Sequence, residues 1–258
     1  MILIDELEGD AESSSSSAVD LRNEEDDSTT MHALARSTKV GVAVARRIIT
    51  ASGSQHLEAQ DVDGYTPLHV AVQCDNHVVV KELLDAGADK NASCGYVDVS
   101  CHRNPLGIAA LEGSSRSLTL LLAAGVHPSA SILDAGEHLP QTSPLHDACA
   151  MGALECAKQL LFAGASITSR TNWGAMPLHR CCSNPKSLDL VDLLLNFSLS
   201  TAGSTAVDNL INAEDQYGRT PFTVAAAERR ITDVYLSDVR DVVVELFLSF
   251  SASRLPPL

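Results

Sequence analysis

A short motif recurs along this chain and limits the folds that the sequence can adopt. The hexapeptide T-P-L-H-V-A at 66–71 returns as S-P-L-H-D-A at 143–148 and as M-P-L-H-R-C at 176–181. Weaker copies stand at 29–32, 104–106 and 220–225. A chain that repeats itself in this way builds one structural unit several times, and each unit is short.

A second landmark shows that the units are rigid and that their connectors differ. Gly87, Gly125 and Gly164 each lie 20 residues after the proline of their unit. The motif prolines themselves are 38, 39, 33 and 44 residues apart. The number of residues from proline to glycine is therefore constant within these repeats, whereas the length of the connectors varies.

Each unit predicts two short helices. Thr or Ser before Pro is the favoured order of cap and first-turn residue at a helix start. The glycine stands where a residue of left-handed conformation ends the second helix. In one such helix Val79, Val80, Leu83 and Leu84 follow helical spacing and need a neighbour to bury them. One helix pair cannot supply that neighbour, so the units must stack into a solenoid.

These residues resemble the ankyrin repeat, most clearly in D-V-D-G-Y-T-P-L-H at 61–69 followed by V-V-K-E-L-L-D-A-G-A-D at 79–89. The resemblance implies an all-α solenoid of about six repeats, with a β-turn or hairpin finger before each helix pair and a concave binding face. It covers about residues 29–253, in units of about 29–57, 61–92, 99–128, 138–168, 171–200 and 215–253, with a short tail at 254–258.

The connectors and the two end units depart from this pattern. Long inserts stand at 92–103, 127–141 and 199–212, and the last of these is polar. Such inserts either shape a binding surface or reflect neutral variation in loop length. The end units carry polar positions that predict solvent-facing caps, namely Lys39, Arg46, Arg47 and Thr50 in the first unit and Asp238, Asp241, Glu245 and Ser249 in the last.

Residues 1–28 predict a disordered acidic and Ser-rich tail. Residues 1–30 hold ten acidic side chains and one basic one, which is -9 of the chain's net charge of -15. A segment of this kind buries too little apolar surface to offset its ordering entropy. The serine run at 13–17 is either a solvated segment or a phosphorylation site.

Charge and cysteine content narrow the setting in which we expect this chain to act. Its acidity disfavours nucleic acid and anionic membranes as partners. No apolar run reaches the ~18 residues of a membrane span, and the N-terminus lacks the order of a signal peptide. Seven cysteines without C-x-x-C pairs favour free thiols in a reducing compartment. We therefore expect an intracellular protein, cytoplasmic or nuclear.

The histidines and cysteines of the motif predict structure rather than chemistry. His146 with Cys149, and His179 with Cys182, are three residues apart on one helix and could suggest metal ligands. The resemblance instead gives the motif histidine a hydrogen bond between neighbouring units, and buried free cysteine packs as a small hydrophobe. A zinc site at Cys94, Cys101 and His102 remains an alternative that offers three ligands where a structural site wants four.

No nucleophile elbow, phosphate-binding loop or H-E-x-x-H motif occurs in the sequence. We therefore expect no enzyme activity, no metal and no cofactor. The predicted role is a non-catalytic scaffold or adaptor, monomeric, that binds a protein partner and no small-molecule substrate. The alternative is a regulatory or substrate-recruiting subunit of an enzyme complex such as a ubiquitin ligase or a kinase.

The candidate partner-binding residues are those that the repeat does not need for its own structure. Trp173 and Tyr217 both stand just before a finger glycine, and Tyr65 stands just after one. Large aromatic side chains dominate binding hot spots, although these could equally pack between adjacent fingers. Positions on the first helix of a unit are expected to face the groove, and they supply Val70, Gln73, Asp147, Met151 and Arg180.

Overall fold

The computed structural model describes residues 22–23, 26–53, 56–94, 103–129, 141–184 and 187–228. These residues form α-helices joined by turns, and the one β-bridge among them pairs Cys94 with Arg103 in antiparallel fashion. The chain divides into two compact units, Met1–Asp89 and Lys90–Leu258. The predicted all-α fold of repeated helix pairs is confirmed in each unit.

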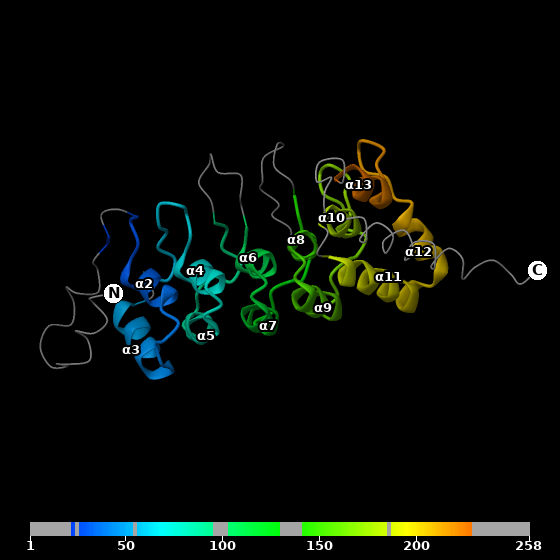
Figure 1. Ribbon diagram of the computed structural model, residues 1–258. Helices are drawn as coiled ribbons and strands as arrows, with labels where there is room; N and C mark the ends of the chain where they lie inside the picture. Colours follow the sequence, from blue (N-terminus) through cyan, green and yellow to red (C-terminus); the bar gives the residue numbers. More distant parts are fainter. Residues whose placement is uncertain are drawn as a thin grey trace, which may run out of the picture. The chain divides into compact units, whose positions relative to one another are not determined.

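The first unit consists of two helix pairs. They are α2 (Thr30–Arg36) with α3 (Val42–Ser52), and α4 (Pro67–Gln73) with α5 (His77–Asp85). The first helices of the two pairs pack on each other, and so do the second helices, so the pairs lie in register (Figure 1). Leu34, Leu68 and Leu83 are fully buried between them.

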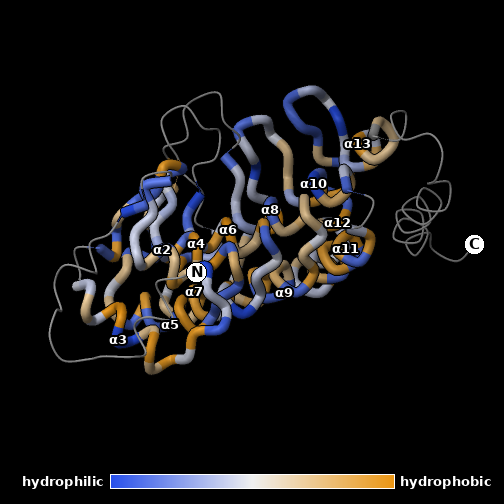
Figure 2. The backbone as a smooth tube through the Cα atoms, turned by 60° about the vertical axis from the view of Figure 1, so that its left-hand side comes forward, coloured by the Kyte–Doolittle hydropathy of each residue, from blue (hydrophilic) through white to orange (hydrophobic). Residues whose placement is uncertain are grey.

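The second unit repeats this arrangement over a longer stretch of chain. Its inner row contains α6 (Pro105–Glu112), α8 (Pro144–Met151), α10 (Pro177–Ser183) and α13 (Pro221–Glu228), each packed on the next. Its outer row contains α7 (Ser115–Ala123), α9 (Leu154–Phe162) and α11 (Leu188–Ala202), and α12 (Ser204–Ile211) follows on α11. Hydrophobic residues follow the helices, whereas the loops between pairs are mostly hydrophilic (Figure 2).

The helix ends are those that the motif residues predict. Proline occupies the first turn of α4, α6, α8 and α10, where its missing N–H costs no hydrogen bond. Gly87, Gly125 and Gly164 have φ values of 94°, 84° and 94°, which lie in the left-handed region that glycine adopts without strain. These glycines therefore end α5, α7 and α9 at the predicted places.

The chain makes a turn before α4, α10 and α13, at 61–65, 171–175 and 215–219, and we call each such turn a finger. In the fingers at 61–65 and 215–219 an aspartate carboxylate accepts two backbone N–H groups: Asp61 from Asp63 and Tyr65, and Asp215 from Tyr217 and Arg219. The backbone N–H of each aspartate donates to the carbonyl four residues ahead, which closes the turn. The Cys94–Arg103 bridge joins the two ends of the finger that carries the first long insert.

The structure differs from the sequence prediction in three places. The first is the boundary between the predicted tail and the first repeat. Asp26 and Ser28 were expected in the tail, yet Val62 donates a backbone hydrogen bond to the carbonyl of Asp26, and Ser28 is buried. Arg36 also forms an ion pair with Asp26. The fold therefore includes residues 26–28, because the first finger supplies backbone and charged partners that no composition argument can detect.

The second difference concerns Arg46, which is exposed, as expected of a cap, but also forms an ion pair with the neighbouring repeat. Its Nε and Nη2 atoms donate to Oε2 and Oε1 of the buried Glu82 on α5, at 2.8 and 2.9 Å. The hydrogen bond from Arg46 is the main reason why the pKa of Glu82 is lowered. Arg46 therefore faces solvent and also connects α3 to the next outer helix.

The third difference is that the polar insert 199–212 is largely helical. Helix α11 continues to Ala202, and after Gly203 the chain forms α12. Val207 and Leu210 of α12 are buried, and α12 packs against α11. The predicted polar stripe of the last helix, the insert at 127–141 in its greater part, and the tails 1–21 and 254–258 lie outside the described residues.

Candidate interaction surface of the second unit

Three motif histidines each join their inner helix to the finger of the next repeat. The Nε2 atom of His146 lies 3.1 Å from the carbonyl oxygen of Ala175, and that of His179 lies 3.1 Å from the carbonyl oxygen of Arg219. In the first unit His32 makes the same contact with Tyr65 at 2.8 Å. The motif histidine was predicted to form a hydrogen bond between neighbouring repeats, and these three contacts confirm it.

The second ring nitrogen shows that these histidines are neutral. Nδ1 of His146 accepts the backbone N–H of Ser143 at 3.2 Å, and the Ser143 hydroxyl lies 2.8 Å from the same atom. Because a backbone N–H can only donate, Nδ1 carries no proton and Nε2 is the donor to Ala175. Burial lowers the pKa of His146 to about 4 and also lowers that of His179. Both ring nitrogens of His146 and of His179 are therefore used in hydrogen bonds within the fold.

The cysteines near these histidines are equally buried. Cys149 on α8 and Cys181 and Cys182 on α10 lie together, and burial raises the pKa of Cys181 well above its usual range and that of Cys182 to about 12. Thiols of this kind are unreactive. In the described part of the chain no group of three His, Cys, Asp or Glu residues could hold a metal ion. Cys101 and His102, the other members of the alternative zinc site at Cys94, lie outside the described residues.

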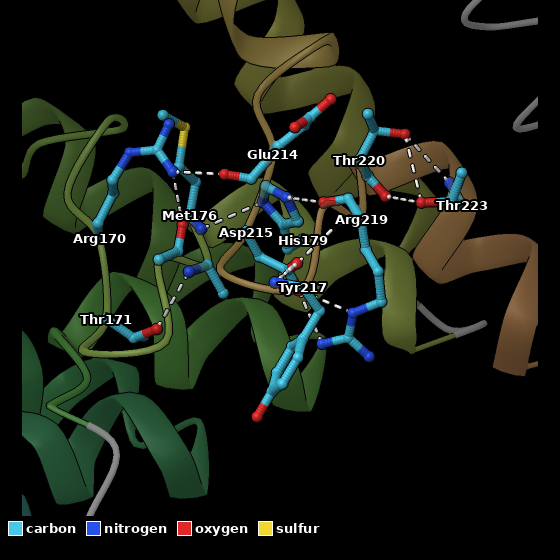
Figure 3. A network of polar contacts seen from close by, with 12 residues as sticks. Arg170, Thr171, Met176, His179, Glu214, Asp215, Tyr217, Arg219, Thr220 and Thr223 are labelled. Atoms are coloured by element: carbon cyan, nitrogen blue, oxygen red, sulfur yellow. Dashed lines mark hydrogen bonds and ion pairs between the residues drawn. The ribbon is translucent and has the colours of Figure 1, made fainter.

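Two neighbouring fingers of the second unit are joined by backbone and side-chain hydrogen bonds (Figure 3). The backbone N–H of Gln216 donates to the carbonyl of Trp173 at 2.9 Å. Nη1 of Arg170 donates to the carbonyls of Gly174 and Glu214 at 2.7 and 2.8 Å, so that one guanidinium holds both fingers. These bonds fix the positions of residues 173 and 217 relative to each other.

The charge inside the second of these fingers is also balanced. Arg219 donates to Asp215 through Nε at 2.8 Å, and its Nη2 lies 2.7 Å from the same oxygen. Burial opposes ionisation of Asp215, but the hydrogen bonds from the Arg219 side chain and from the N–H groups of Arg219 and Tyr217 outweigh it and lower the pKa. The base of the finger is therefore an ionised, fully hydrogen-bonded turn.

The aromatic side chains at the finger tips remain exposed. Tyr217 is 64% exposed and Trp173 is 40% exposed. The Tyr217 ring points away from the polar network, with the guanidinium of Arg219 4.9 Å from its centroid (Figure 3). Tyr65, in the first unit, differs: it is only partly exposed and packs edge-on against His69 of its own repeat. Its carbonyl oxygen lies 2.8 Å from Nε2 of His32 in the preceding repeat.

The five predicted inner-helix residues divide according to exposure. Gln73 and Met151 are exposed and Arg180 is partly exposed, but Val70 and Asp147 are each only 2% exposed. Val70 is covered by its neighbours, and Asp147 is held by Nε and Nη2 of Arg103 at 3.1 and 3.2 Å. The expectation that Val70 and Asp147 face a partner is therefore corrected, because neither side chain offers a surface.

Among the described residues, sequence reasoning missed two exposed aromatic side chains, namely Phe222 on α13, which is 44% exposed, and Phe162. Phe162, at the end of α9, is 87% exposed. It follows Leu160 and Leu161 and so reads as part of an apolar core run. The available signal was its alignment with Asp85 and Ala123, which occupy the same place in the two preceding L-L-x-A-G segments and are exposed.

Comparison with known proteins agrees with this architecture. The chain matches a family model described as ankyrin repeats, in three copies at residues 8–94, 44–132 and 145–236. A crystal structure of the human ASB11 ankyrin repeat domain superposes with a TM-score of 0.68 at 20% identity, covering 100% of this chain and 94% of that one. At this level of identity the likeness concerns the fold.

Curated relatives share the repeats over part of their length. The human B-cell lymphoma 3 protein is 36% identical over 128 residues, which is 50% of this chain and 26% of that protein. The human ankyrin repeat and SOCS box protein 16 is 37% identical over 123 residues (48% and 23%), and the Drosophila melanogaster tyrosine-protein kinase Shark is 29% identical over 153 residues (59% and 15%). The chain thus spans less than a third of each of these relatives.

Within the described residues no helix is long and apolar enough to cross a membrane.

Proposed function

Because this chain belongs to the ankyrin-repeat family, a family of protein-interaction modules, we propose that it is a non-catalytic scaffold or adaptor, acting as a monomer. It binds a protein partner through the finger tips and inner helices of its second unit. One observation carries this proposal: two large aromatic side chains, Trp173 and Tyr217, are exposed on fingers that are joined to each other by hydrogen bonds.

A rigid base makes exposed aromatic residues effective in binding. Association costs less free energy when the contacting groups are already held in place. The Gln216–Trp173 bond and the two bonds from Arg170 hold the backbone of both fingers, so that little is left to order on binding. Tryptophan and tyrosine are also the residue types that most often dominate interface energies.

The experiment compares three versions of the full chain by affinity purification and quantitative mass spectrometry. We expect the double variant Trp173→Ala with Tyr217→Ala to lose the proteins that the wild type enriches, with binding weaker by roughly tenfold or more, as for hot-spot residues. Phe162→Ala is the matched control, because it removes an aromatic side chain that is more exposed but lies on an outer helix. It should retain those proteins.

Thermal unfolding separates a binding role from a packing role. Since both side chains are exposed, we expect the double variant to unfold within a few degrees of the wild type. A large loss of thermal stability together with unchanged capture would assign Trp173 and Tyr217 to packing between fingers and would refute the proposal.

The alternative, a subunit of an enzyme complex, draws on the names of some relatives. Two of them are tyrosine-protein kinases, of which this chain covers 15% each, and another carries a SOCS box. In such a complex the repeats would recruit other proteins, and those proteins would supply the enzyme activity. The same purification decides it, since a ligase or kinase subunit lost only from the finger variant would identify the partner class.

A further inference from the structure

Arg180 lies at the centre of the inner row of the second unit. It belongs to α10, which packs between α8 and α13. The same position of the motif is Asp147 on α8, one repeat earlier. Arg180 is partly exposed, and its positive charge contributes to the lowered pKa of the buried His146 after the larger effect of burial. Its side chain therefore lies close to α8.

The other arginines of the inner row and the fingers have acceptors. Arg103 is paired with Asp147, Arg219 is paired with Asp215, and Arg170 donates to two carbonyls. Arg180 differs from all three: among the described residues nothing accepts a hydrogen bond from its guanidinium, and its Nε is buried without a partner. A buried donor that lacks an acceptor costs free energy, more so when it is charged.

Helix α8 offers no free carboxylate that could pair with Arg180. Asp147 already accepts both hydrogen bonds from Arg103, and the hydroxyl of Thr142 lies 3.4 Å from its Oδ2. A carboxylate that arrives from outside would be the natural complement of the two terminal nitrogens, because it can accept two parallel hydrogen bonds from a guanidinium, whereas the buried Nε is out of its reach. Met151 on the adjacent helix and the finger aromatics supply exposed apolar surface in the same unit.

We propose that Arg180 is a recognition site for a carboxylate, namely an Asp or Glu side chain within an extended segment of the protein partner that lies along the inner row of the second unit. This inference rests on the proposed function and adds a specificity residue and a ligand class to it. The partner segment is acidic at one position and apolar beside it.

The test is a selection of phage-displayed random dodecapeptides on the immobilised full chain. The wild type should enrich peptides that share Asp or Glu at one fixed position. Arg180→Gln, which removes the charge and keeps a shorter polar side chain, should bind those peptides roughly tenfold to a hundredfold more weakly, as expected for a charged hydrogen bond. Arg180→Glu should instead enrich Lys or Arg at that position. Arg116→Gln on the outer row is the matched control and should bind like the wild type.

The possible outcomes test the carboxylate site at Arg180 separately from the proposed protein-binding function. Peptides that bind the wild type and lose affinity with the Trp173 and Tyr217 variant, but bind Arg180→Gln equally well, would uphold the function and overturn the carboxylate site. Failure of both the wild type and the variant that lacks residues 1–21 to enrich any peptide would overturn both. Acidic peptides that are enriched only after deletion of residues 1–21 would show that the chain's own acidic segment occupies the site, which would overturn its assignment to a partner.

Discussion

At the scale of single residues, His146 shows how one side chain serves two repeats. Its Nδ1 accepts the N–H at the start of its own helix, and its Nε2 donates to a carbonyl of the next finger. Only the neutral ring with hydrogen on Nε2 makes both bonds. Protonation would place a donor against the Ser143 N–H and a charge in a fully buried site.

This geometry predicts that acid weakens the fold. The pKa of His146 is about 4 when folded, against a reference value of 6.5. The unfolded chain therefore binds more protons between these values, so stability is complete above pH ~6.5 and falls as the pH drops toward ~4. The full effect is about 3 kcal/mol, of which about 2 kcal/mol is lost between pH ~7.5 and ~5. Urea unfolding at these two pH values measures it.

Two variants check the assignment to His146. His146→Gln removes the titrating group and should leave a pH dependence that is flatter by about 2 kcal/mol over the same range, which leaves the contributions of His32 and His179. His77→Gln, at an exposed position on α5, should retain the steeper dependence of the wild type. Equal pH profiles for the wild type and His146→Gln would contradict the prediction.

At the scale of elements, the joined fingers place a demand on one glycine that alignment alone does not show. Gly174 has φ of +75°, and a Cβ built on it would lie 3.1 Å from the backbone N of Gln216 in the next finger. Gly218 occupies the same place in that next finger, with φ of +70° and nothing within 4 Å. Both positions are strained for alanine, but only Gly174 also clashes with backbone.

Alanine at the two positions should therefore have unequal costs. We expect Gly218→Ala to destabilise the protein by about 1–2 kcal/mol, the cost of left-handed backbone for an L-residue. Gly174→Ala should cost more, because the neighbouring finger must also move and its hydrogen bond with Trp173 weakens. Denaturant unfolding of the two variants gives the difference. Equal losses would mean that the fingers are not held together as the structure shows.

The helices differ in how far sequence predicts them. The ends of α5, α7 and α9 were predictable because glycine encodes a left-handed residue locally. Helix α12 was not, since its Ser, Thr, Asp and Asn residues are typical of a loop and its stability comes from Val207 and Leu210 packed on α11. Local signals specify the ends, whereas tertiary packing creates the unexpected element.

At the scale of the whole molecule, neighbouring repeats pack on each other within each compact unit, and the stability of such a stack is close to a sum over adjacent interfaces. The same property limits prediction of the binding residues. Alignment placed Val70, Asp147 and Arg180 at one motif position. Their exposure and pairing differ because different residues, such as Arg103 beside Asp147, occupy the neighbouring repeats. The sequence predicts the place of these residues on the inner helix. It does not predict which residues of the neighbouring repeats cover them or pair with them.

A cavity in one repeat should consequently loosen the protein locally. Leu160→Ala removes a fully buried side chain of α9 and should cost about 2–5 kcal/mol. Hydrogen exchange followed by mass spectrometry should rise most in α9 and in α7, α8 and α11, which pack on it, and least in α2–α5, which belong to the other compact unit. Phe162→Ala on the same helix is the control and should leave exchange unchanged. A uniform rise along the chain would show one cooperative unit instead.

The acceptor of the histidine bond is a main-chain carbonyl, and this has an evolutionary consequence. Tyr65, Ala175 and Arg219 offer that carbonyl in their fingers although their side chains have nothing in common. Since every residue type presents the same peptide group, mutation at this position leaves the bond available. Fingers can therefore diversify toward new partners while the repeats beneath them stay joined, and selection for binding need not compete with selection for stability at these sites.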